Sequence, residues 1–114
     1  MGGAVPIGLG LALAQPNKRV MVATGDGEML MGIGALATVA VKAPKNLAIC
    51  VFDNERYGET GMQEAHTSHG VDLAGMAAAA GFAETATVWT KKEIDGALSL
   101  LYDAKGPVFV DIKV

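Results

Sequence analysis

A glycine-flanked carboxylate near the start of this 114-residue chain has the residue types of a site for phosphate and metal. The segment reads Thr24-Gly25-Asp26-Gly27-Glu28. Gly25 and Gly27 allow a strand to turn sharply into a helix and bring backbone N–H groups close to an anion. Asp26 offers the carboxylate oxygen that hard cations prefer. The segment therefore predicts a turn that binds a phosphate group together with a divalent cation.

A second polar segment, Asp53 to Gly58, follows the next apolar run of the chain. Asn54 supplies an amide oxygen, and the backbone carbonyl of Arg56 is a further candidate ligand. Magnesium requires near-octahedral oxygen coordination at about 2.1 Å, which Asp26, Asn54 and Arg56 would complete together with phosphates and water. The two segments together predict a clamp for a magnesium-bound diphosphate.

Both segments lie at one edge of a predicted parallel sheet. Lys18–Thr24 and Asn46–Asp53 are apolar almost throughout, which is typical of strands covered by helices on both faces. A helix over about Glu28–Val41 connects them and ends near Ala43-Pro44. Ligands of open parallel sheets bind where strands end and helices begin. We therefore expect the diphosphate at the amino end of this helix.

The rest of the chain continues the alternation of helices and strands. Asn54–Val71 has no sustained period and is expected to be a long loop, with room for one short helical turn. The other predicted elements are a helix over Ala4–Ala14, a helix from an Asp72 cap to Ala80 with Gly81 as its stop, a strand over Ala86–Trp89, a helix over Lys91–Asp103 with Thr90 as its N-cap, and a strand over Val108–Val114. This order predicts one α/β domain over residues 1–114, with a parallel sheet between two layers of helices.

Composition limits the classes of function. Hydrophobic residues make up 51% of the chain, and its single cysteine, Cys50, lies in an apolar run and is expected to be buried. The net charge of -3 and the scattered Lys and Arg residues argue against nucleic-acid binding. No apolar stretch reaches the roughly 18 to 20 residues of a membrane-spanning helix, so we expect a cytoplasmic protein that does not contact a membrane.

Each polar segment alone also has a simpler interpretation. Gly25-Asp26-Gly27 is typical of a tight turn, and Asp53-Asn54 is typical of a strand-end cap. The glycines do not extend to the dinucleotide pattern Gly-x-Gly-x-x-Gly, because Leu30 stands at the third glycine position. No Gly-Lys-Ser/Thr occurs either. These absences argue against a dinucleotide-binding Rossmann unit and against a P-loop.

Taken together, Gly25-Asp26-Gly27, Asn54 after 26 intervening residues, and the Tyr57-Gly58 pair resemble the cofactor-binding signature of the thiamine diphosphate enzymes. The resemblance implies a thiamine diphosphate-binding fold with Mg²⁺ bound by Asp26, Asn54 and the Arg56 carbonyl. The family often has Asn-Asn where this chain has Asp53-Asn54. Because the second position is the ligand, the resemblance implies an intact metal site.

The resemblance also implies a set of residues around the cofactor. The opening Met1-Gly2-Gly3-Ala4 looks like a family segment in which a bulky apolar residue supports the bent cofactor, and Met1 would take that role. Leu30 is a candidate to line the cofactor, with core packing as an equal alternative. His66 is a candidate substrate contact. The implied cofactor-binding residues are Met1, Gly25, Asp26, Gly27, Glu28, Leu30, Asn54, Arg56, Tyr57 and Gly58.

Within the family, the stretch from Asp53 to Gln63 resembles most closely the sulfopyruvate and phosphonopyruvate decarboxylases. This resemblance implies a lyase component that acts on a small 2-oxoacid. An acetolactate synthase-like enzyme or a 2-oxoacid oxidoreductase component is an alternative within the family. A non-catalytic cofactor-binding or interaction module is the alternative outside catalysis.

The group that activates the cofactor is not visible in this sequence. In the family, a glutamate from a separate pyrimidine-binding domain, usually of a neighbouring chain, relays the proton. No glutamate here stands in a matching context, so we assign no catalytic residue. The family's sheet also has more strands than the four predicted here, which implies either a fragment truncated before the first strand or a compact variant whose exposed sheet edge is covered by another subunit. We therefore expect a fragment or subunit that acts in an oligomer with a pyrimidine-binding partner.

Overall fold

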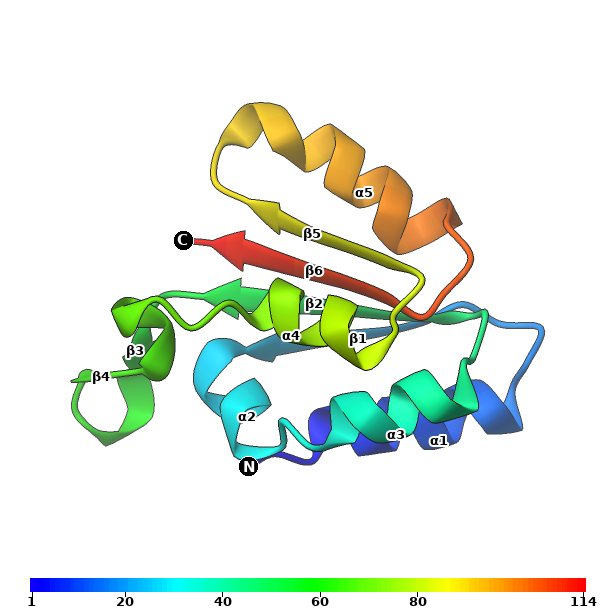
Figure 1. Ribbon diagram of the computed structural model, residues 1–114, viewed down its shortest axis with the longest axis horizontal. Helices are drawn as coiled ribbons and strands as arrows, with labels where there is room; N and C mark the ends of the chain where they lie inside the picture. Colours follow the sequence, from blue (N-terminus) through cyan, green and yellow to red (C-terminus); the bar gives the residue numbers. More distant parts are fainter.

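The computed structural model describes residues 1–114 and has a four-stranded parallel sheet at its centre (Figure 1). The strands are β1 (Val20–Gly25), β2 (Leu47–Asp53), β5 (Glu84–Val88) and β6 (Val108–Lys113), in the spatial order β1-β2-β6-β5. Every neighbouring pair is parallel, so all four carboxyl ends meet at one edge. The four predicted strands are thus confirmed, with small shifts of their ends.

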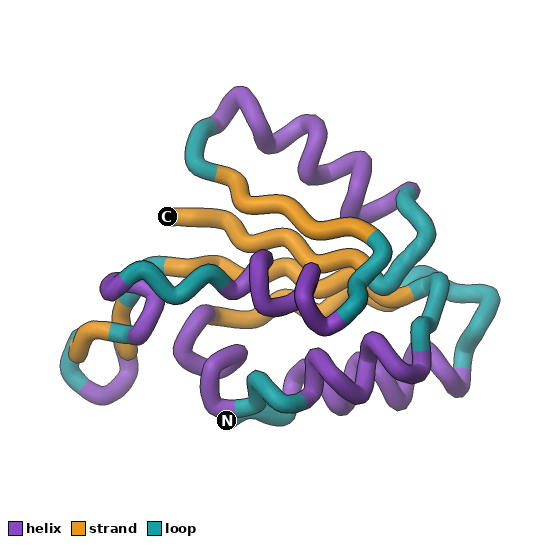
Figure 2. Tube along the Cα trace, in the orientation of Figure 1, coloured by secondary structure: helices purple, strands orange, loops and turns teal.

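Helices cover both faces of the sheet and make three layers (Figures 1 and 2). The helices on one face are α1 (Ala4–Ala14), α3 (Ala35–Lys42) and α4 (Leu73–Ala80). On the other face α5 (Ile94–Asp103) packs mainly against β2, β5 and β6. This arrangement confirms the predicted three-layer α/β/α fold.

Alternation along the strands sends successive side chains to opposite faces. Ile49 and Phe109 join the larger core cluster under α1, α3 and α4, whereas Ala48, Cys50 and Val110 join the smaller cluster under α5. Both faces of the inner strands are therefore covered, which explains their nearly continuous apolar runs. Cys50 is buried, as its sequence context predicts.

Two helix starts have the caps that the sequence predicts. The Asp72 side chain accepts a hydrogen bond from the Gly75 N–H at 2.8 Å, and Gly81 ends α4 with a left-handed φ of 112°. Thr90 and Glu93 form a capping box in front of α5. The first turn after Thr90 is a 3-10 helix, so α5 itself begins three residues later than predicted.

The predicted helix over Glu28–Val41 is wrong in its bounds, because the structure divides it into two. The first part, α2 (Asp26–Met31), begins two residues earlier than predicted, and the second part is α3. Between them the chain passes close to the amino-terminal segment, and a Cβ on Gly32 would lie 2.3 Å from the Gly2 carbonyl oxygen. Only glycine at these positions lets the two backbone segments approach so closely. The apolar period of the sequence continues across the break, so it gives no sign that the helix is interrupted.

The segment predicted as a long loop, Asn54–Val71, is more structured than expected. β3 (Arg56–Tyr57) pairs antiparallel with β4 (Gln63–Glu64), and 3-10 turns occupy Gly58–Thr60 and His66–His69. The hairpin projects from the carboxyl edge of the sheet (Figure 1). These elements are too short for side-chain periodicity to reveal them.

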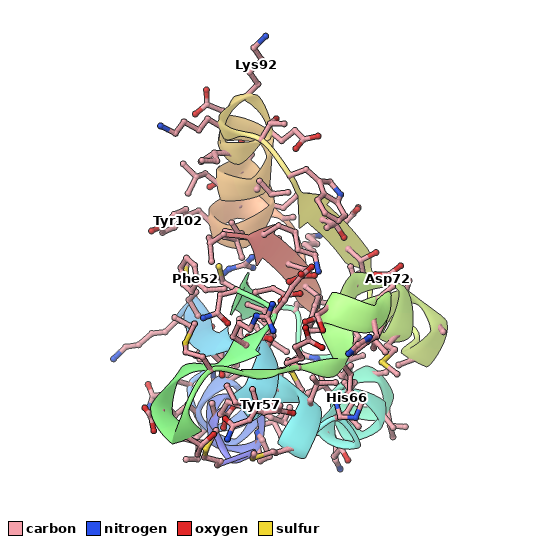
Figure 3. All side chains as sticks on the ribbon, turned by 90° about the vertical axis from the view of Figure 1, so that its left-hand side faces the viewer. Phe52, Tyr57, His66, Asp72, Lys92 and Tyr102 are labelled. Atoms are coloured by element: carbon pink, nitrogen blue, oxygen red, sulfur yellow. The ribbon has the colours of Figure 1, made fainter.

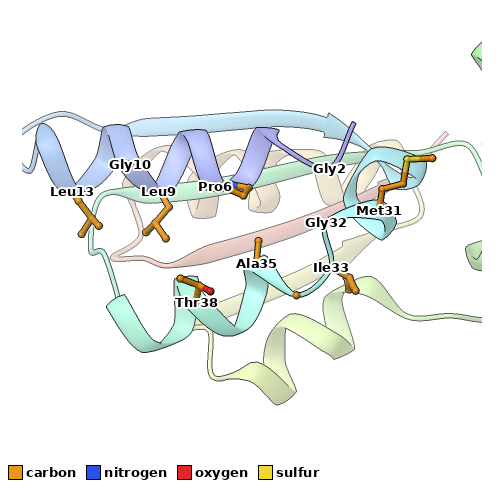
Figure 4. A pocket seen from close by; sticks show the side chains of 11 residues that line it. Gly2, Pro6, Leu9, Gly10, Leu13, Met31, Gly32, Ile33, Ala35 and Thr38 are labelled. Atoms are coloured by element: carbon orange, nitrogen blue, oxygen red, sulfur yellow. The ribbon is translucent and has the colours of Figure 1, made fainter.

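A groove of about 550 Å³ lies between α1 and the start of α3 (Figure 4). Its apolar walls include Pro6, Leu9 and Leu13 from α1 and Ile33 and Ala35 from the opposite side.

β1 pairs only with β2, so its outer edge has no neighbouring strand. The structure has no helix with both the length and the apolar character needed to cross a bilayer.

Gly8 sets how closely α1 lies on β1. A Cβ at Gly8 would meet Val22 Cγ2 at 2.1 Å, and this β-branched side chain has little freedom to turn away. A Cβ on Gly10 of the same helix would meet nothing within 4 Å. We predict that Gly8→Ala lowers the free energy of unfolding by about 1–3 kcal/mol, whereas Gly10→Ala raises it by up to about 1 kcal/mol. Urea unfolding measures both changes, and equal effects would contradict this close packing.

β6 carries a buried carboxylate near its end. Asp111 is 1% exposed, its Oδ1 has no hydrogen-bond partner, and its Oδ2 lies 3.5 Å from the Lys113 Nζ. Burial raises the pKa of Asp111 to about 6; Lys113 acts against this rise, and Asp53 adds to it. The folded protein therefore binds a proton on Asp111 more tightly than the unfolded chain does.

This pKa predicts a pH dependence of stability. The ordinary value is 3.8 and the folded value about 6, so the stabilisation from protonated Asp111 is present below pH 3.8 and is lost as the pH rises to about 6. We predict that the free energy of unfolding of Asp111→Asn, relative to the unaltered protein, increases over that interval. Asp95→Asn at an exposed site is the matched control. An equal increase in both variants, measured by denaturant unfolding, would contradict the prediction.

Candidate functional site

A cavity of about 620 Å³ lies at the carboxyl ends of β1 and β2. Figure 3 looks onto this edge of the sheet. The parallel register sets Gly25 beside Phe52, so the polar segments that follow the two strands come together. The residues predicted around the cofactor that line this cavity are Met1, Gly25, Asp26, Gly27, Glu28, Asn54, Arg56, Tyr57 and Gly58.

Asp26 is the first residue of α2 and is 2% exposed. Its Oδ2 lies 3.3 Å from the Thr67 hydroxyl, and no lysine, arginine or histidine pairs with it. Burial, followed by the charge of Asp53, raises the pKa of Asp26, while hydrogen bonds from Gly27 and Thr67 act against the rise. A bound cation would offset both the burial and the repulsion, so this carboxylate fits a metal ligand.

Asn54 begins a turn that two side-chain oxygens hold in place. Asn54 Oδ1 accepts a hydrogen bond from the Arg56 N–H at 3.0 Å, and Asp53 Oδ1 accepts one from the Glu55 N–H at 2.9 Å. Glu55 has a left-handed φ of 61°, which is uncommon for a residue other than glycine. An amide oxygen has two lone pairs, so the Asn54 oxygen keeps one for a metal ion.

Gly27 is required by the close approach of Tyr57. A Cβ on Gly27 would lie 2.6 Å from two ring carbons of Tyr57, which belongs to β3. The hairpin therefore rests on the start of α2 and forms one wall of the cavity. Glycine at position 27 is therefore explained by the packing of the Tyr57 ring as well as by the predicted approach of an anion.

Glu28 connects the amino-terminal segment to the site by hydrogen bonds. Its Oε1 accepts a hydrogen bond from the Ala4 N–H at 3.0 Å, and its Oε2 accepts one from the Thr24 hydroxyl at 2.7 Å. Burial acts to raise the pKa of Glu28, but the hydrogen bonds outweigh it and leave that pKa below its ordinary value. Both oxygens of the Glu28 carboxylate thus already accept hydrogen bonds within the chain. The bond to Ala4 holds the amino-terminal segment, which includes Met1, beside the cavity.

Two predicted site residues lie outside the cavity lining. Leu30 packs against the larger core cluster, and its neighbour Met31 lines the cavity instead. His66 is exposed on the segment after the hairpin and is not among the lining residues (Figure 3). His69 Nε2 lies 3.1 Å from Glu64 Oε2, also away from the cavity. The substrate contact of His66 stays a prediction.

Sequence reasoning did not identify Thr67 or Lys113 as parts of the site. The buried Thr67 hydroxyl lies between Asp26 and Asp53, yet Thr67 is 41 positions from Asp26 in the chain. Lys113 bonds to Asp53 from a strand 60 positions further along. No motif spacing connects such pairs. The one available signal is the charged pair Asp111 and Lys113 at alternate positions of an otherwise apolar strand.

The oxygen ligands that the sequence predicts for this site are of the kinds that bind magnesium. No group of three His, Cys, Asp or Glu side chains gathers as a metal centre. The expected set is one carboxylate from Asp26, one amide oxygen from Asn54 and one carbonyl from Arg56. Magnesium is commonly held by one or two carboxylates together with water and substrate phosphates, so this set fits it.

Solved structures share this fold. A thiamine diphosphate-dependent 4-hydroxybenzoylformate decarboxylase from Rhodococcus jostii RHA1 matches with a TM-score of 0.83 and 22% sequence identity. The match covers 100% of this chain and 23% of that chain. At this identity the likeness establishes the fold alone.

Curated relatives are similar in sequence along the whole chain. A phosphonopyruvate decarboxylase from Streptomyces viridochromogenes is 39% identical over 100% of this chain and 28% of its own length. The sulfopyruvate decarboxylase subunit beta from Methanothermobacter thermautotrophicus is 40% identical over 100% of this chain and 58% of its own length. The chain thus spans less than two thirds of the length of these relatives.

A family model covers nearly the entire sequence. Its description is "Thiamine pyrophosphate enzyme, C-terminal TPP binding domain", and it matches residues 1–112. The match includes both polar segments and the four strands that position them, except for Lys113 at the end of β6. The chain therefore belongs to the thiamine pyrophosphate enzyme family, as a C-terminal TPP binding domain.

Proposed function

We propose that this chain binds thiamine diphosphate through Mg²⁺, as the diphosphate-binding domain or subunit of a 2-oxoacid decarboxylase. The observation that carries the proposal is the cavity at the carboxyl edge of β1 and β2. There a buried Asp26 without a cationic partner lines the same cavity as Asn54 and Arg56. The family match and the names of the curated relatives support the same assignment.

In this proposal the residues of the chain anchor and orient the cofactor. The Asp26 carboxylate, the Asn54 amide oxygen and the Arg56 carbonyl oxygen hold Mg²⁺, and the glycines beside Asp26 let the backbone approach the diphosphate. Met1 supports the cofactor from the amino-terminal side. When bound, thiamine diphosphate supplies the carbanion and the electron sink that decarboxylation of a 2-oxoacid requires.

A partner supplies the acid–base group in this proposal. The only glutamate side chains at the cavity are Glu28, which is engaged with Ala4 and Thr24, and Glu59, which is exposed on the hairpin. Curated relatives are named as beta subunits, which supports a second subunit. We infer that a pyrimidine-binding domain or subunit brings the activating glutamate, and that the active form is an oligomer in the cytoplasm.

The names of the relatives support a substrate class as well. Phosphonopyruvate and sulfopyruvate, as printed in those names, are 2-oxoacids with a second anionic group. Arg56 lines the cavity, and its guanidinium pairs with the exposed Glu64 at 3.0 Å. Exposed ion pairs contribute only about 0–1 kcal/mol, so a substrate anion would replace Glu64 at small cost.

A 2-oxoacid oxidoreductase component is the second candidate function. The beta subunit of 2-oxoacid:ferredoxin oxidoreductase 2 from Aeropyrum pernix is 45% identical over 67 residues, which are 58% of this chain and 21% of that protein. The two functions differ in their need for an electron acceptor. Release of carbon dioxide without an acceptor would favour the decarboxylase, and release only with an acceptor would favour the oxidoreductase.

Asn54 provides a test of the metal site that leaves the fold largely intact, because its side chain is exposed and its one hydrogen bond lies within a surface turn. We predict that Asn54→Ala weakens magnesium-dependent binding of thiamine diphosphate by at least about tenfold. Calorimetric titration with the cofactor, with and without Mg²⁺, measures the effect. Asn17→Ala is the matched control, since Asn17 is exposed between α1 and β1. Equal affinity of the Asn54 variant and the control would refute the ligand role.

The dependence on a partner is tested by activity. We predict that this chain alone does not release carbon dioxide from sulfopyruvate or phosphonopyruvate in the presence of thiamine diphosphate and Mg²⁺. Addition of a pyrimidine-binding subunit that carries a glutamate should restore turnover, and the Gln variant of that glutamate should not. Turnover by the isolated chain would contradict the proposed division of roles. If the complete assembly binds the cofactor but turns over no 2-oxoacid, a non-catalytic module is favoured.

A further inference from the structure

Three charged side chains lie on one face of the sheet at its carboxyl edge. The register of β2 and β6 pairs Asp53 with Lys113 and Val51 with Asp111. Because alternate strand residues share a face, Asp53, Asp111 and Lys113 all lie on the same side as the larger core cluster. Asp53 and Asp111 are each 1% exposed, and the Lys113 side chain is 14% exposed.

Lys113 is the cation of this group. Its Nζ donates a short hydrogen bond to Asp53 Oδ2, lies 3.5 Å from Asp111 Oδ2 and lies 4.0 Å from Glu55 Oε1. It also lies 5.4 Å from the centre of the Trp89 ring. Removal of one partner from a buried ion pair leaves an uncompensated charge, which is much more costly than removal of both.

Asp53 connects the two segments that carry the proposed magnesium ligands. Its Oδ1 accepts the Glu55 N–H at 2.9 Å, directly after Asn54, and contacts the Thr67 hydroxyl at 2.9 Å. The same hydroxyl lies 3.3 Å from Asp26 Oδ2. A hydroxyl has a single proton, so Thr67 donates to one carboxylate at a time, to Asp53 at the shorter distance or to Asp26 at the longer one. Asp53 thus contacts the Asn54 turn directly and Asp26 through one side chain.

We propose that Lys113 is a positioning residue for the magnesium site. By compensating the buried charge of Asp53, it keeps that carboxylate between the Glu55 N–H and Thr67, and so fixes Asn54 and Asp26 relative to each other. This inference rests on the proposed function, since it concerns the same metal ligands. It adds the interaction network Lys113, Asp53 and Thr67, in which no side chain is itself a metal ligand.

The test compares variants that remove one charge with a variant that removes both. In the full protein that carries this chain, with its partner subunit where one exists, Lys113→Met removes the ammonium and keeps a long side chain. The Mg²⁺ concentration for half-maximal binding of thiamine diphosphate should rise by about tenfold or more, as for other residues that orient metal ligands. Asp53→Asn combined with Lys113→Met removes both charges and keeps an oxygen acceptor. This double variant should return to within about threefold of the unaltered protein, because the Asp53 charge that Lys113 compensates is removed together with it.

Two further variants keep the test decisive if Lys113→Met does not fold. Thr67→Val removes the hydroxyl at nearly constant volume and should raise the Mg²⁺ requirement by about tenfold, whereas Thr67→Ser keeps the hydroxyl and should not. Lys105→Met, at an exposed site without an ion pair, is the control for loss of a lysine. Unfolding midpoints are recorded for every variant.

The outcomes separate this inference from the proposed function. If the unaltered protein binds no thiamine diphosphate with Mg²⁺, the proposed function fails. If it binds, and Lys113→Met or Thr67→Val lowers only the unfolding midpoint without changing the Mg²⁺ requirement, the positioning role is overturned. A raised requirement in Lys113→Met that the double variant does not recover would likewise overturn the role of charge compensation.

Discussion

The parallel pairing of β1 with β2 is the constraint on which the site depends. It places the carboxyl ends of both strands at one edge, so that Gly25 lies beside Phe52 and the next residues begin the two polar segments. The helices contribute by covering the faces of these strands with apolar side chains. Without this register, Asp26 and Asn54 would lie at different heights along the sheet and could not share one cation.

The edge of the sheet concentrates negative charge in a region of low exposure. Asp26, Asp53 and Asp111 are each 1–2% exposed, and Lys113 is the cation that pairs with two of them. Burial of this kind costs free energy unless a partner compensates it. Asp26 has no protein cation within ion-pair distance, which makes it the position where a bound metal ion would have the largest effect. In the proposed function, Lys113 compensates the charge of Asp53, and the bound metal ion would compensate the charge of Asp26.

The sequence predicted much of this architecture because its main signals are local. Apolar runs that end in polar residues located all four strands, and Asp72, Gly81 and the Thr90 cap marked helix ends. The glycine-flanked Asp26 and the following Asn54 were predicted to share a site, and both line one cavity. Their role as metal ligands stays a prediction.

The remaining features depend on contacts between distant segments, which periodicity does not encode. The break between α2 and α3 follows from the approach of Gly2 to Gly32, and the partly buried Leu30 packs against the larger core cluster. Thr67 and Lys113 reach the site from 41 and 60 positions away. His66 is exposed after a hairpin that is too short to be seen in the sequence.

The most direct test of the account is the location of the metal ion. Crystals of the protein grown with thiamine diphosphate and Mn²⁺ in place of Mg²⁺ would show the ion by its anomalous scattering. We predict one peak at about 2.1–2.2 Å from a carboxylate oxygen of Asp26, the Asn54 amide oxygen and the Arg56 carbonyl oxygen, in contact with the diphosphate. A cofactor bound with no metal at Asp26 and Asn54, or with its diphosphate elsewhere on the chain, would contradict the account.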